Sequence, residues 1–379
     1  MKVLFLTDGI FPFQLGGMQK HSLILCQLLL KKGVDVHLVH CVGSEYSREK
    51  LNELFPASEG KLTETIIQFP KTDPFPGHYV RENKKYSKLI YEEVRSDLAN
   101  IDIIYSQGYT AWYFLKKKDS FKAPVLVNFH GYEMFQFAPD LKVKIAHKIL
   151  RPAVKTIIKK VDGVYSFGGQ IDRIISSLGL DKTKILHQSN GINQDWIRKD
   201  VETSRGVRKF VFIGRNERRK GIEELNEAIK LFLNNDINAE FSFIGPIEQI
   251  FKDQRIQYLG ELRDVEQIKQ VIDESDCLVC PSHSEGMPTV ILEAMARGLA
   301  IIATDVGAVS RMINGNGILL KNADPTLIAS ALKEIVELPV DQLNEMKLRS
   351  IELVRNQFLW EKIVEDKIQQ FKDILESKD

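Results

Sequence analysis

The sequence contains 379 residues with a formal net charge of +1, and 44% of its residues are hydrophobic. A chain of this length and apolar content exceeds one average domain and can bury two cores, so we expect two domains. No segment approaches the about 20 consecutive apolar residues of a membrane-spanning helix, and the apolar run Val3–Leu6 ends too soon for a secretory signal. These features argue against an integral membrane protein, and we expect a cytoplasmic location.

Charge is distributed unevenly along the chain. Residues 1–180 carry 25 Lys and Arg against 18 Asp and Glu, so the first half is positive and the remainder is negative. A positive first half suits an anionic membrane surface or a phosphate-bearing acceptor, and it suits equally well a solvated basic face without a partner. We expect no nucleic-acid partner.

The four cysteines predict neither a disulfide framework nor a metal site. Cys277 and Cys280 form an isolated pair, without the further cysteines or histidines that complete a zinc site. They lie in an apolar run that predicts a buried strand, in which cysteine acts as a small hydrophobic residue.

Short apolar runs alternate with segments of helical period in both halves of the chain, which predicts βαβ units and parallel sheets. In the first half we expect strands at Lys2–Leu6, Val34–His40, Thr65–Phe69, Ile101–Tyr105, Pro124–Phe129 and Gly163–Ser166. In the second half we expect them at Lys209–Ile213, Glu240–Ile244, Ile256–Leu259, Cys277–Cys280, Ala300–Thr304 and Gly317–Leu320. The fold class is therefore α/β, with two Rossmann-like, doubly wound parallel sheets.

The segment Lys184–Arg208 is mixed and polar and contains the turn signal Asn190-Gly191. We therefore place the domain boundary there, with residues 1–187 in the first domain and 188–357 in the second. The final segment, 358–379, begins with an amphipathic helical pattern over Phe358–Ile374.

The first expected strand is followed by Gly16 and Gly17 and then by a helix through Leu30. A glycine pair at a helix start lets backbone N–H groups approach an anion, and the helix terminus carries partial positive charge. Phosphate is the natural ligand for such a turn. The same pair is as often only turn geometry.

Two further features of the first half carry polar chemistry. His130 directly follows a predicted strand, where open α/β sheets form their binding crevices, although a single histidine there is more often structural. The segment Leu141–Lys160 contains seven Lys or Arg and no acid, with apolar residues between them. We expect a helix pair broken near Pro152, which lies either on an anionic membrane or with its apolar side against the core.

In the second half, Arg215 and Lys220 follow a predicted strand and precede a helix. Arginine offers a fork for bidentate phosphate contact and lysine a compact point charge. We expect the neighbouring Arg218 and Arg219 to be solvated.

The most informative stretch runs from Glu285 to Glu293. A loop with Gly286 and Pro288 leads into an expected helix over Thr289–Ala296, whose first amides can hold a diphosphate or sugar hydroxyls. Two carboxylates in this arrangement can accept hydrogen bonds from different parts of one ligand. Taken alone, an isolated pair of this kind is better explained as a surface-loop glutamate and a helix glutamate.

Taken in order, these motifs resemble the retaining glycosyltransferases of family 4, which have the GT-B fold. The resemblance spans nearly the whole chain and comprises the Gly16-Gly17 loop, Gly33–Leu38, His130 with Glu133, Asn190-Gly191-Ile192, Gly214-Arg215 with Lys220-Gly221, Phe243-Ile244-Gly245, and Glu285 to Glu293. It departs from the family pattern at Gly307–Arg311, where Arg311 replaces an acid that is common in the family.

The resemblance implies a nucleotide-diphosphate sugar bound in a cleft, with roles for particular residues. It implies catalytic roles for His130, Arg215, Lys220 and Glu285, with the two cations on the diphosphate. The donor site that it implies consists of Gly16, Gly17, Arg215, Lys220, Glu285, Gly286, Met287, Pro288, Thr289, Val290 and Glu293. It also implies that no metal or cofactor is needed and that the C-terminal helix crosses back to the first domain.

On this basis we expect a retaining hexosyltransferase that uses a UDP-sugar, with a GDP-sugar as the alternative donor. The acceptor is expected to be a glycan or a lipid-linked molecule of cell-surface polysaccharide or lipopolysaccharide synthesis, with peripheral membrane contact through Leu141–Lys160. Alternatives are another GT-B enzyme, namely a nucleotide-sugar epimerase or an inverting transferase, and a non-enzymatic sugar- or nucleotide-binding protein.

Overall fold

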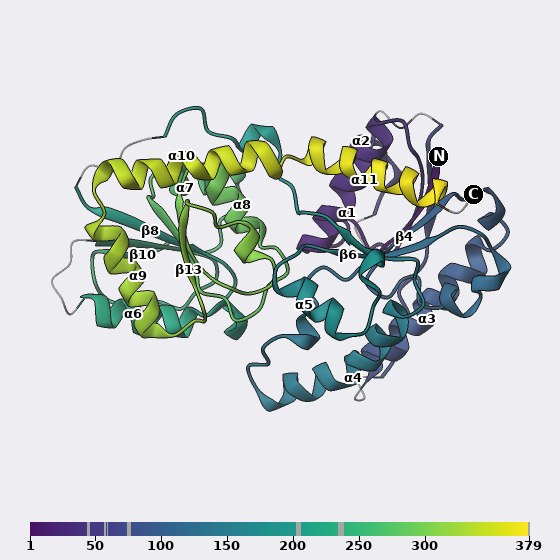
Figure 1. Ribbon diagram of the computed structural model, residues 1–379, viewed down its shortest axis with the longest axis horizontal. Helices are drawn as coiled ribbons and strands as arrows, with labels where there is room; N and C mark the ends of the chain where they lie inside the picture. The colour runs from purple at the N-terminus through teal and green to yellow at the C-terminus, as the bar shows by residue number, and fades with distance from the viewer. Residues whose placement is uncertain are drawn as a thin grey trace.

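The computed structural model describes residues 1–43, 46–56, 58, 60–73, 77–201, 206–233 and 239–377. It consists of two α/β domains, each built on a parallel sheet with helices on both faces (Figure 1). Two long helices at the end of the chain run along one side of both domains. The predicted GT-B arrangement is therefore confirmed.

The first sheet has seven parallel strands in the order β3-β2-β1-β4-β5-β6-β7. Their bounds are β1 Lys2–Leu6, β2 Asp35–His40, β3 Leu62–Ile66, β4 Ile103–Gln107, β5 Val125–Asn128, β6 Gly163–Ser166 and β7 Ile185–His187. Strand β3 begins three residues before the predicted run, and β7 was not predicted at all. Strand β7 has only three residues and none is fully buried, so it lacks the apolar run that identifies a strand in a sequence.

Alternate residues of β1 face two different cores. Val3 and Phe5 pack with helices α1 (Gly17–Lys31) and α2 (Arg48–Leu54) on one side of the sheet. Leu4 and Leu6 pack with α3 (His78–Val94), α4 (Leu141–Ile158) and α5 (Gln170–Ser177) on the other side. This alternation is the two-residue period of a strand that is buried on both faces.

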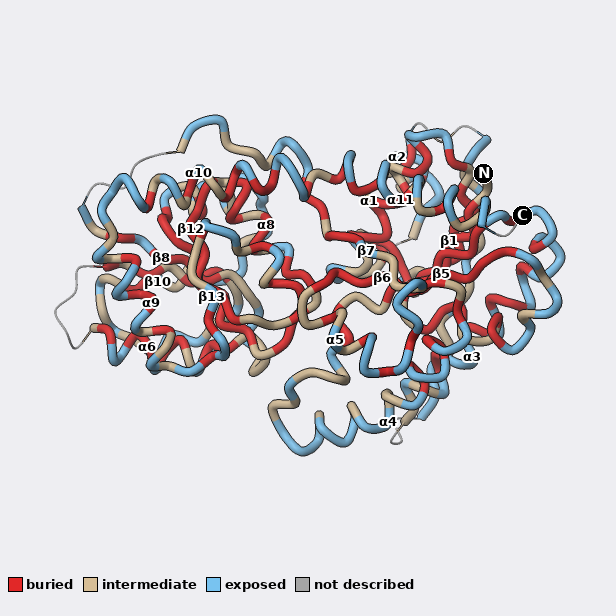
Figure 2. The backbone as a smooth tube through the Cα atoms, viewed as in Figure 1, coloured by how far each residue is buried: buried red, intermediate tan, exposed pale blue. Residues whose placement is uncertain are grey.

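Helix α4 corrects one expectation, because it is a single helix that runs through Pro152 without a break. Pro152 and Lys148 are both exposed, so water can hydrate the Lys148 carbonyl that lacks a helical N–H donor. The residues of α4 that are buried begin only at Ala153. Its first half projects from the body of the domain (Figure 2).

The second sheet has six parallel strands in the order β10-β9-β8-β11-β12-β13. Their bounds are β8 Arg208–Ile213, β9 Ala239–Ile244, β10 Ile256–Tyr258, β11 Cys277–Cys280, β12 Ala300–Thr304 and β13 Gly317–Leu320, each within one residue of the prediction. The helices are α6 Ile222–Leu233, α7 Val265–Asp273, α8 Thr289–Ala296, α9 Pro325–Glu337 and α10 Val340–Gln357. All four cysteines are buried free thiols, and Cys277 and Cys280 lie in β11 as expected.

Helix α11 (Trp360–Glu376) follows α10 but packs on the first domain. Val364 and Phe371 are fully buried in the same core as Phe5 and the buried residues of α1. This is the crossing that the resemblance implies. Since β7 ends at residue 187 and β8 begins at 208, the boundary placed at 187/188 lies in the connection between the two sheets.

The packing of α11 generates a stability prediction. Phe371→Ala removes a fully buried ring from the core that contains Phe5 and α1, and should lower the free energy of unfolding by roughly 3–5 kcal/mol. Urea unfolding followed by circular dichroism measures the change. Lys372→Ala, at the exposed neighbouring position on the same helix, is the control and should change it by less than about 0.5 kcal/mol. Equal midpoints for the two variants would show that α11 is not part of this core.

Candidate functional site

A cavity of about 790 Å³ lies between the two domains. The volume is within the range of roughly 300–1,000 Å³ that is usual for small-molecule sites. The loops that follow the strands of both sheets line it, as expected for open parallel sheets. Residues from the first domain include Gly17, Lys20, His21, His130 and Glu133, and residues from the second include Arg215, Arg219, Lys220, Glu285, Gly286, Met287, Pro288, Thr289, Val290 and Glu293.

The structure therefore brings nearly all of the predicted site residues to one cavity. Gly16 is the exception, since it precedes helix α1 as its N-cap and does not line the cavity. In the described part of the chain, no group of three or more His, Cys, Asp or Glu side chains is arranged to hold a metal ion.

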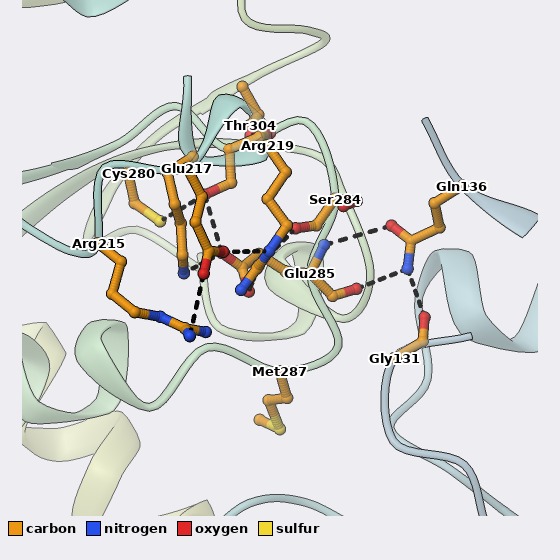
Figure 3. Close-up of polar contacts among 12 residues, drawn as sticks. Gly131, Gln136, Arg215, Glu217, Arg219, Cys280, Ser284, Glu285, Met287 and Thr304 are labelled. Atoms are coloured by element: carbon orange, nitrogen blue, oxygen red, sulfur yellow. Dashed lines mark hydrogen bonds and ion pairs between the residues drawn. The ribbon is translucent and has the colours of Figure 1, made fainter. Parts of the chain in front are cut away.

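Glu285 is held by hydrogen bonds and ion pairs from both domains (Figure 3). Its Oε1 atom accepts hydrogen bonds from Lys220 Nζ at 2.6 Å and from Ser282 Oγ at 2.9 Å. Arg219 Nη1 lies 3.5 Å from the other oxygen, Oε2. The carboxylate is only 9% exposed, so two cations and a hydroxyl hold its orientation before any ligand arrives.

Arg219 corrects the expectation that it is solvated. Its side chain is 22% exposed, lines the cavity and pairs with Glu217 at 2.8 Å as well as with Glu285. Arg218 also has partners, because its guanidinium binds Glu224 on α6. By contrast, the Arg215 side chain is 71% exposed and pairs with Glu217 at 3.0 Å. Of the cations in this segment, Arg215, Arg219 and Lys220 line the cavity and Arg218 does not.

The backbone of Glu285 is bound by the first domain. Gln136 Nε2 donates to the Glu285 carbonyl at 2.7 Å, and the Glu285 N–H donates to Gln136 Oε1 at 3.3 Å. The same Nε2 also donates to the Gly131 carbonyl, as Figure 3 shows. A Cβ added to Gly286 would lie 3.0 Å from the Gly131 Cα, so the two glycine backbones touch across the cleft. The domains are thus joined at the residue that also organises the cations.

Helix α8 begins at Thr289, and Pro288, Thr289 and Val290 at its start line the cavity. Pro288 offers no capping side chain and its carbonyl accepts from the Ile291 N–H at 3.2 Å, which leaves the Thr289 and Val290 amides without a helical acceptor within the described residues. Such a terminus attracts anionic groups. Glu293 lies one turn further along, and burial raises its pKa although the charge of Lys20 opposes the shift. No hydrogen bond or ion pair engages the Glu293 carboxylate within the described residues, which leaves it able to accept one from a ligand.

His130 faces these groups from the first domain. It has a left-handed backbone, φ 57°, in the loop after β5, and its Nε2 donates to Gln107 Oε1 at 2.7 Å. The ring of His21 packs edge-on against it with centroids 5.0 Å apart. Burial, followed by the charge of Lys367, lowers the pKa of His130 from 6.5 to about 3. The imidazole is therefore neutral at physiological pH.

Comparison with known proteins agrees with this geometry. Residues 15–196 match the model of Glycosyltransferase Family 4, and residues 207–337 match that of Glycosyl transferases group 1. The chain belongs to glycosyltransferase family 4.

Individual relatives are more distant. A putative teichuronic acid biosynthesis glycosyltransferase of Bacillus subtilis, TuaC, is 31% identical to this chain. The match covers 54% of this chain and about half, 49%, of that relative. Among solved structures, the sucrose-phosphate synthase of Thermosynechococcus elongatus superposes with a TM-score of 0.77 at 16% identity, over 99% of both chains. Anabaena HepE in complex with UDP and glucose gives 0.66 at 14% identity, over 98% of this chain and 99% of that one. These structural similarities establish the shared fold.

The loop in which this family 4 glycosyltransferase departs from the usual pattern does not line the cavity. Gly307 has φ 54° and lies so close to the Glu285 and Gly286 carbonyls that a Cβ would come within 2.3 Å of both. The Arg311 guanidinium donates from Nη1 to the Phe167 carbonyl of the first domain at 2.8 Å. The loop therefore supports the backbone of the Glu285 loop and ties the domains together.

Several residues of this family 4 site had no signal in the sequence. Gln136 lies in an irregular loop, and its role depends on a contact with Glu285 of the second domain, 149 residues further along the chain. His21 is not among the site residues named from the sequence, but it lines the cavity and its Nδ1 lies 3.1 Å from Asn190 Oδ1. Asn190 in turn donates from Nδ2 to the Met287 carbonyl at 2.7 Å. Only the assembled fold reveals these contacts.

The buried position of His130 predicts an unusual titration. Its pKa of about 3 means that native His130 stays neutral well below pH 6.5, whereas in the unfolded chain it takes a proton near pH 6.5. Its contribution to the free energy of unfolding should therefore fall as the pH decreases from about 6.5 towards 3. A proton NMR titration, with His130→Gln to assign the resonance, measures this pKa. In Lys367→Met the pKa should rise yet stay below 6.5, because burial remains. A wild-type value near 6.5 would contradict the buried, cation-flanked environment.

Proposed function

We propose that this protein is a retaining glycosyltransferase that moves a sugar from a nucleotide-diphosphate donor to a glycan or lipid-linked acceptor. One observation carries the proposal. A single cavity combines a wall of cations at Arg215, Arg219 and Lys220, the amide end of helix α8, and two carboxylates at Glu285 and Glu293. The cations and amides suit a diphosphate, and the carboxylates suit the hydroxyl groups of a sugar and a ribose.

In this reading the residues divide the donor between them. Arg215 and Lys220 bind the diphosphate, Glu293 accepts a hydrogen bond from the ribose, and Glu285 accepts one from the transferred sugar. As the bond from the sugar to the diphosphate breaks, negative charge develops on the leaving phosphate. Positive groups that are already held in place stabilise that charge, and such electrostatic stabilisation is usually the largest single contribution to catalysis. The ion pair with Glu285 holds Lys220 in place for this role.

The acceptor hydroxyl attacks from the first-domain side of the cavity. We infer a front-face reaction in which the departing phosphate takes the proton of the acceptor hydroxyl, so that configuration is retained without a protein nucleophile. His130 contacts the sugar from the facing wall as a neutral imidazole, and therefore adds no positive charge beside the reacting carbon. No metal or cofactor takes part in this scheme.

UDP is the nucleotide that we favour, with GDP as the alternative. The HepE structure has the same fold and contains UDP and glucose, which supports a UDP-sugar donor. The names of relatives in teichuronic acid and capsular polysaccharide biosynthesis support a role in cell-surface polysaccharide or glycolipid synthesis. Two other functions compete with this proposal. One is an epimerase or an inverting transferase on the same fold, and the other is a binding protein without activity.

The proposed function predicts that UDP raises the thermal unfolding temperature more than GDP or ADP does, since a ligand of the native state stabilises it. With a UDP-sugar and an acceptor extract, Lys220→Met should lower kcat/KM by on the order of 10²–10³, the typical cost of losing one transition-state charge contact. Glu285→Gln keeps the shape of the side chain and should also reduce transfer.

Arg263→Gln is the matched control, because that cation is 86% exposed and does not line the cavity. It should leave transfer unchanged. Product analysis by NMR distinguishes the alternatives: an epimerised free sugar nucleotide or an inverted linkage would replace this proposal, and nucleotide binding without any turnover would favour the binding protein.

We also propose that the exposed half of α4 contacts an anionic membrane. Leu141, Ile145 and Ile149 are 72%, 51% and 37% exposed and recur every four residues on one side of the helix. Lys142, Lys144 and Lys148 lie exposed between them. An apolar stripe flanked by lysines on a projecting helix is the pattern of interfacial membrane helices. No helix among the described residues is long and apolar enough to cross a membrane.

This surface predicts salt-sensitive binding to vesicles that contain phosphatidylglycerol. In a sedimentation assay at low salt, the double variant Lys142→Glu/Lys144→Glu should bind at least ten-fold more weakly, since each basic residue contributes about 1 kcal/mol near such a surface. Lys333→Glu on α9 of the second domain has the same type of charge change and should bind normally. Equal binding by all three proteins would place the membrane contact elsewhere or nowhere.

A further inference from the structure

A second cavity, of about 280 Å³, lies where the two domains and helix α11 meet. We call it the hinge cavity. It is lined by the connection after β7, by the end of α10, by one side of α11 and by Arg311 of the second domain. None of its lining residues lines the donor cavity, so the two are distinct sites.

The hinge cavity is surrounded by more positive than negative charge. Arg311, Lys362 and Lys367 line it, and among the described residues Asp366 is the one carboxylate that does so. His187 also lines it but is held by Asp172, with His187 Nε2 3.2 Å from the carboxylate. Three cations from separate positions thus face a space that is far larger than the roughly 30 Å³ share of one water molecule.

These three cations have only neutral partners. Arg311 Nη1 donates to the Phe167 carbonyl, Lys362 Nζ donates to the Asn356 carbonyl at 2.7 Å, and Lys367 Nζ donates to the side-chain oxygen of Gln188 at 2.6 Å. Within the described residues none of the three forms an ion pair. In the donor cavity, by contrast, the carboxylate of Glu285 already compensates Lys220 and Arg219.

Lys367 is the clearest case of a positive charge without a counter-charge in this cavity. It is 2% exposed, and its ammonium lies 3.5 Å from the centre of the Tyr165 ring. A buried charge without a counter-charge is costly, so burial lowers the pKa of this lysine well below its usual value, and an anion bound beside it favours the charged form. Stacking on aromatic rings offsets only part of that cost. A counter-anion in the adjoining cavity is the element that this cluster lacks.

We propose that the hinge cavity binds a small oxyanion, either inorganic phosphate or a phosphomonoester. Phosphate oxygens match the donors available, a guanidinium fork on Arg311 and two ammonium groups on α11. The ligand bridges the domains, because Arg311 belongs to the second domain and Lys367 is buried in the first. Its binding therefore stabilises the domain arrangement in which Gln136 contacts Glu285.

Isothermal titration at constant ionic strength tests this site, with sodium phosphate and glucose 1-phosphate as the probes. Lys362→Gln alters an exposed residue and keeps the fold. Lys367→Met replaces a buried, uncompensated charge by an apolar side chain of similar shape, which removes the cost of burying that charge. Each variant should weaken the binding of the tighter probe at least ten-fold.

Two controls make the result decisive. Lys372→Gln, at an exposed position of α11 outside the cavity, should bind like the wild type. Arg215→Ala should also bind like the wild type, because that residue lines the other cavity. Binding that is lost in Arg215→Ala but kept in Lys367→Met would assign the anion to the donor cavity and overturn the proposal. Absence of binding by both probes would overturn it as well.

Discussion

The arrangement of this protein depends on how Glu285 is held from both sides of the cleft. Its carboxylate receives Lys220 and Ser282 from its own domain, while its backbone exchanges hydrogen bonds with Gln136 of the first domain. The contact requires the glycine backbones of 131 and 286 to touch. Glu285 therefore belongs both to the cavity chemistry and to the contact between the domains. The binding of a ligand to its carboxylate should depend on how the two domains are placed.

Helix α11 supplies the second connection between the domains. It leaves the second domain after α10, buries Phe371 in the core that contains Phe5, and places Lys367 close enough to act on His21 and His130. The charge of Lys367 contributes to keeping His130 neutral, although burial contributes more. Arg311 reaches back across the same junction to the first domain. Helix α11 and Arg311 thus join the domains in addition to the contact at Glu285.

Much of the fold followed from sequence periodicity. Central strands such as β1, β8 and β11 are buried on both faces and read as continuous apolar runs, and helix α8 has the predicted bounds because Pro288 precedes its first residue. The prediction failed where the signal is weak or ambiguous. Strand β7 is three residues long, and Pro152 interrupts no helix because solvent surrounds the turn around it.

The sequence by itself determined the elements and the chemistry that each loop can offer: a row of cations after β8, and two carboxylates with a helix start after β11. These are local properties, set by residue type and spacing. Only the tertiary structure decided which of the cations meets Glu285, that Arg219 pairs with Glu285 while Arg215 is largely exposed, and that Gln136 reaches across the cleft. The reason is physical: these contacts join residues 65 to 149 positions apart, and a hydrogen bond over that separation depends on how two sheets and their loops pack, which no local pattern records.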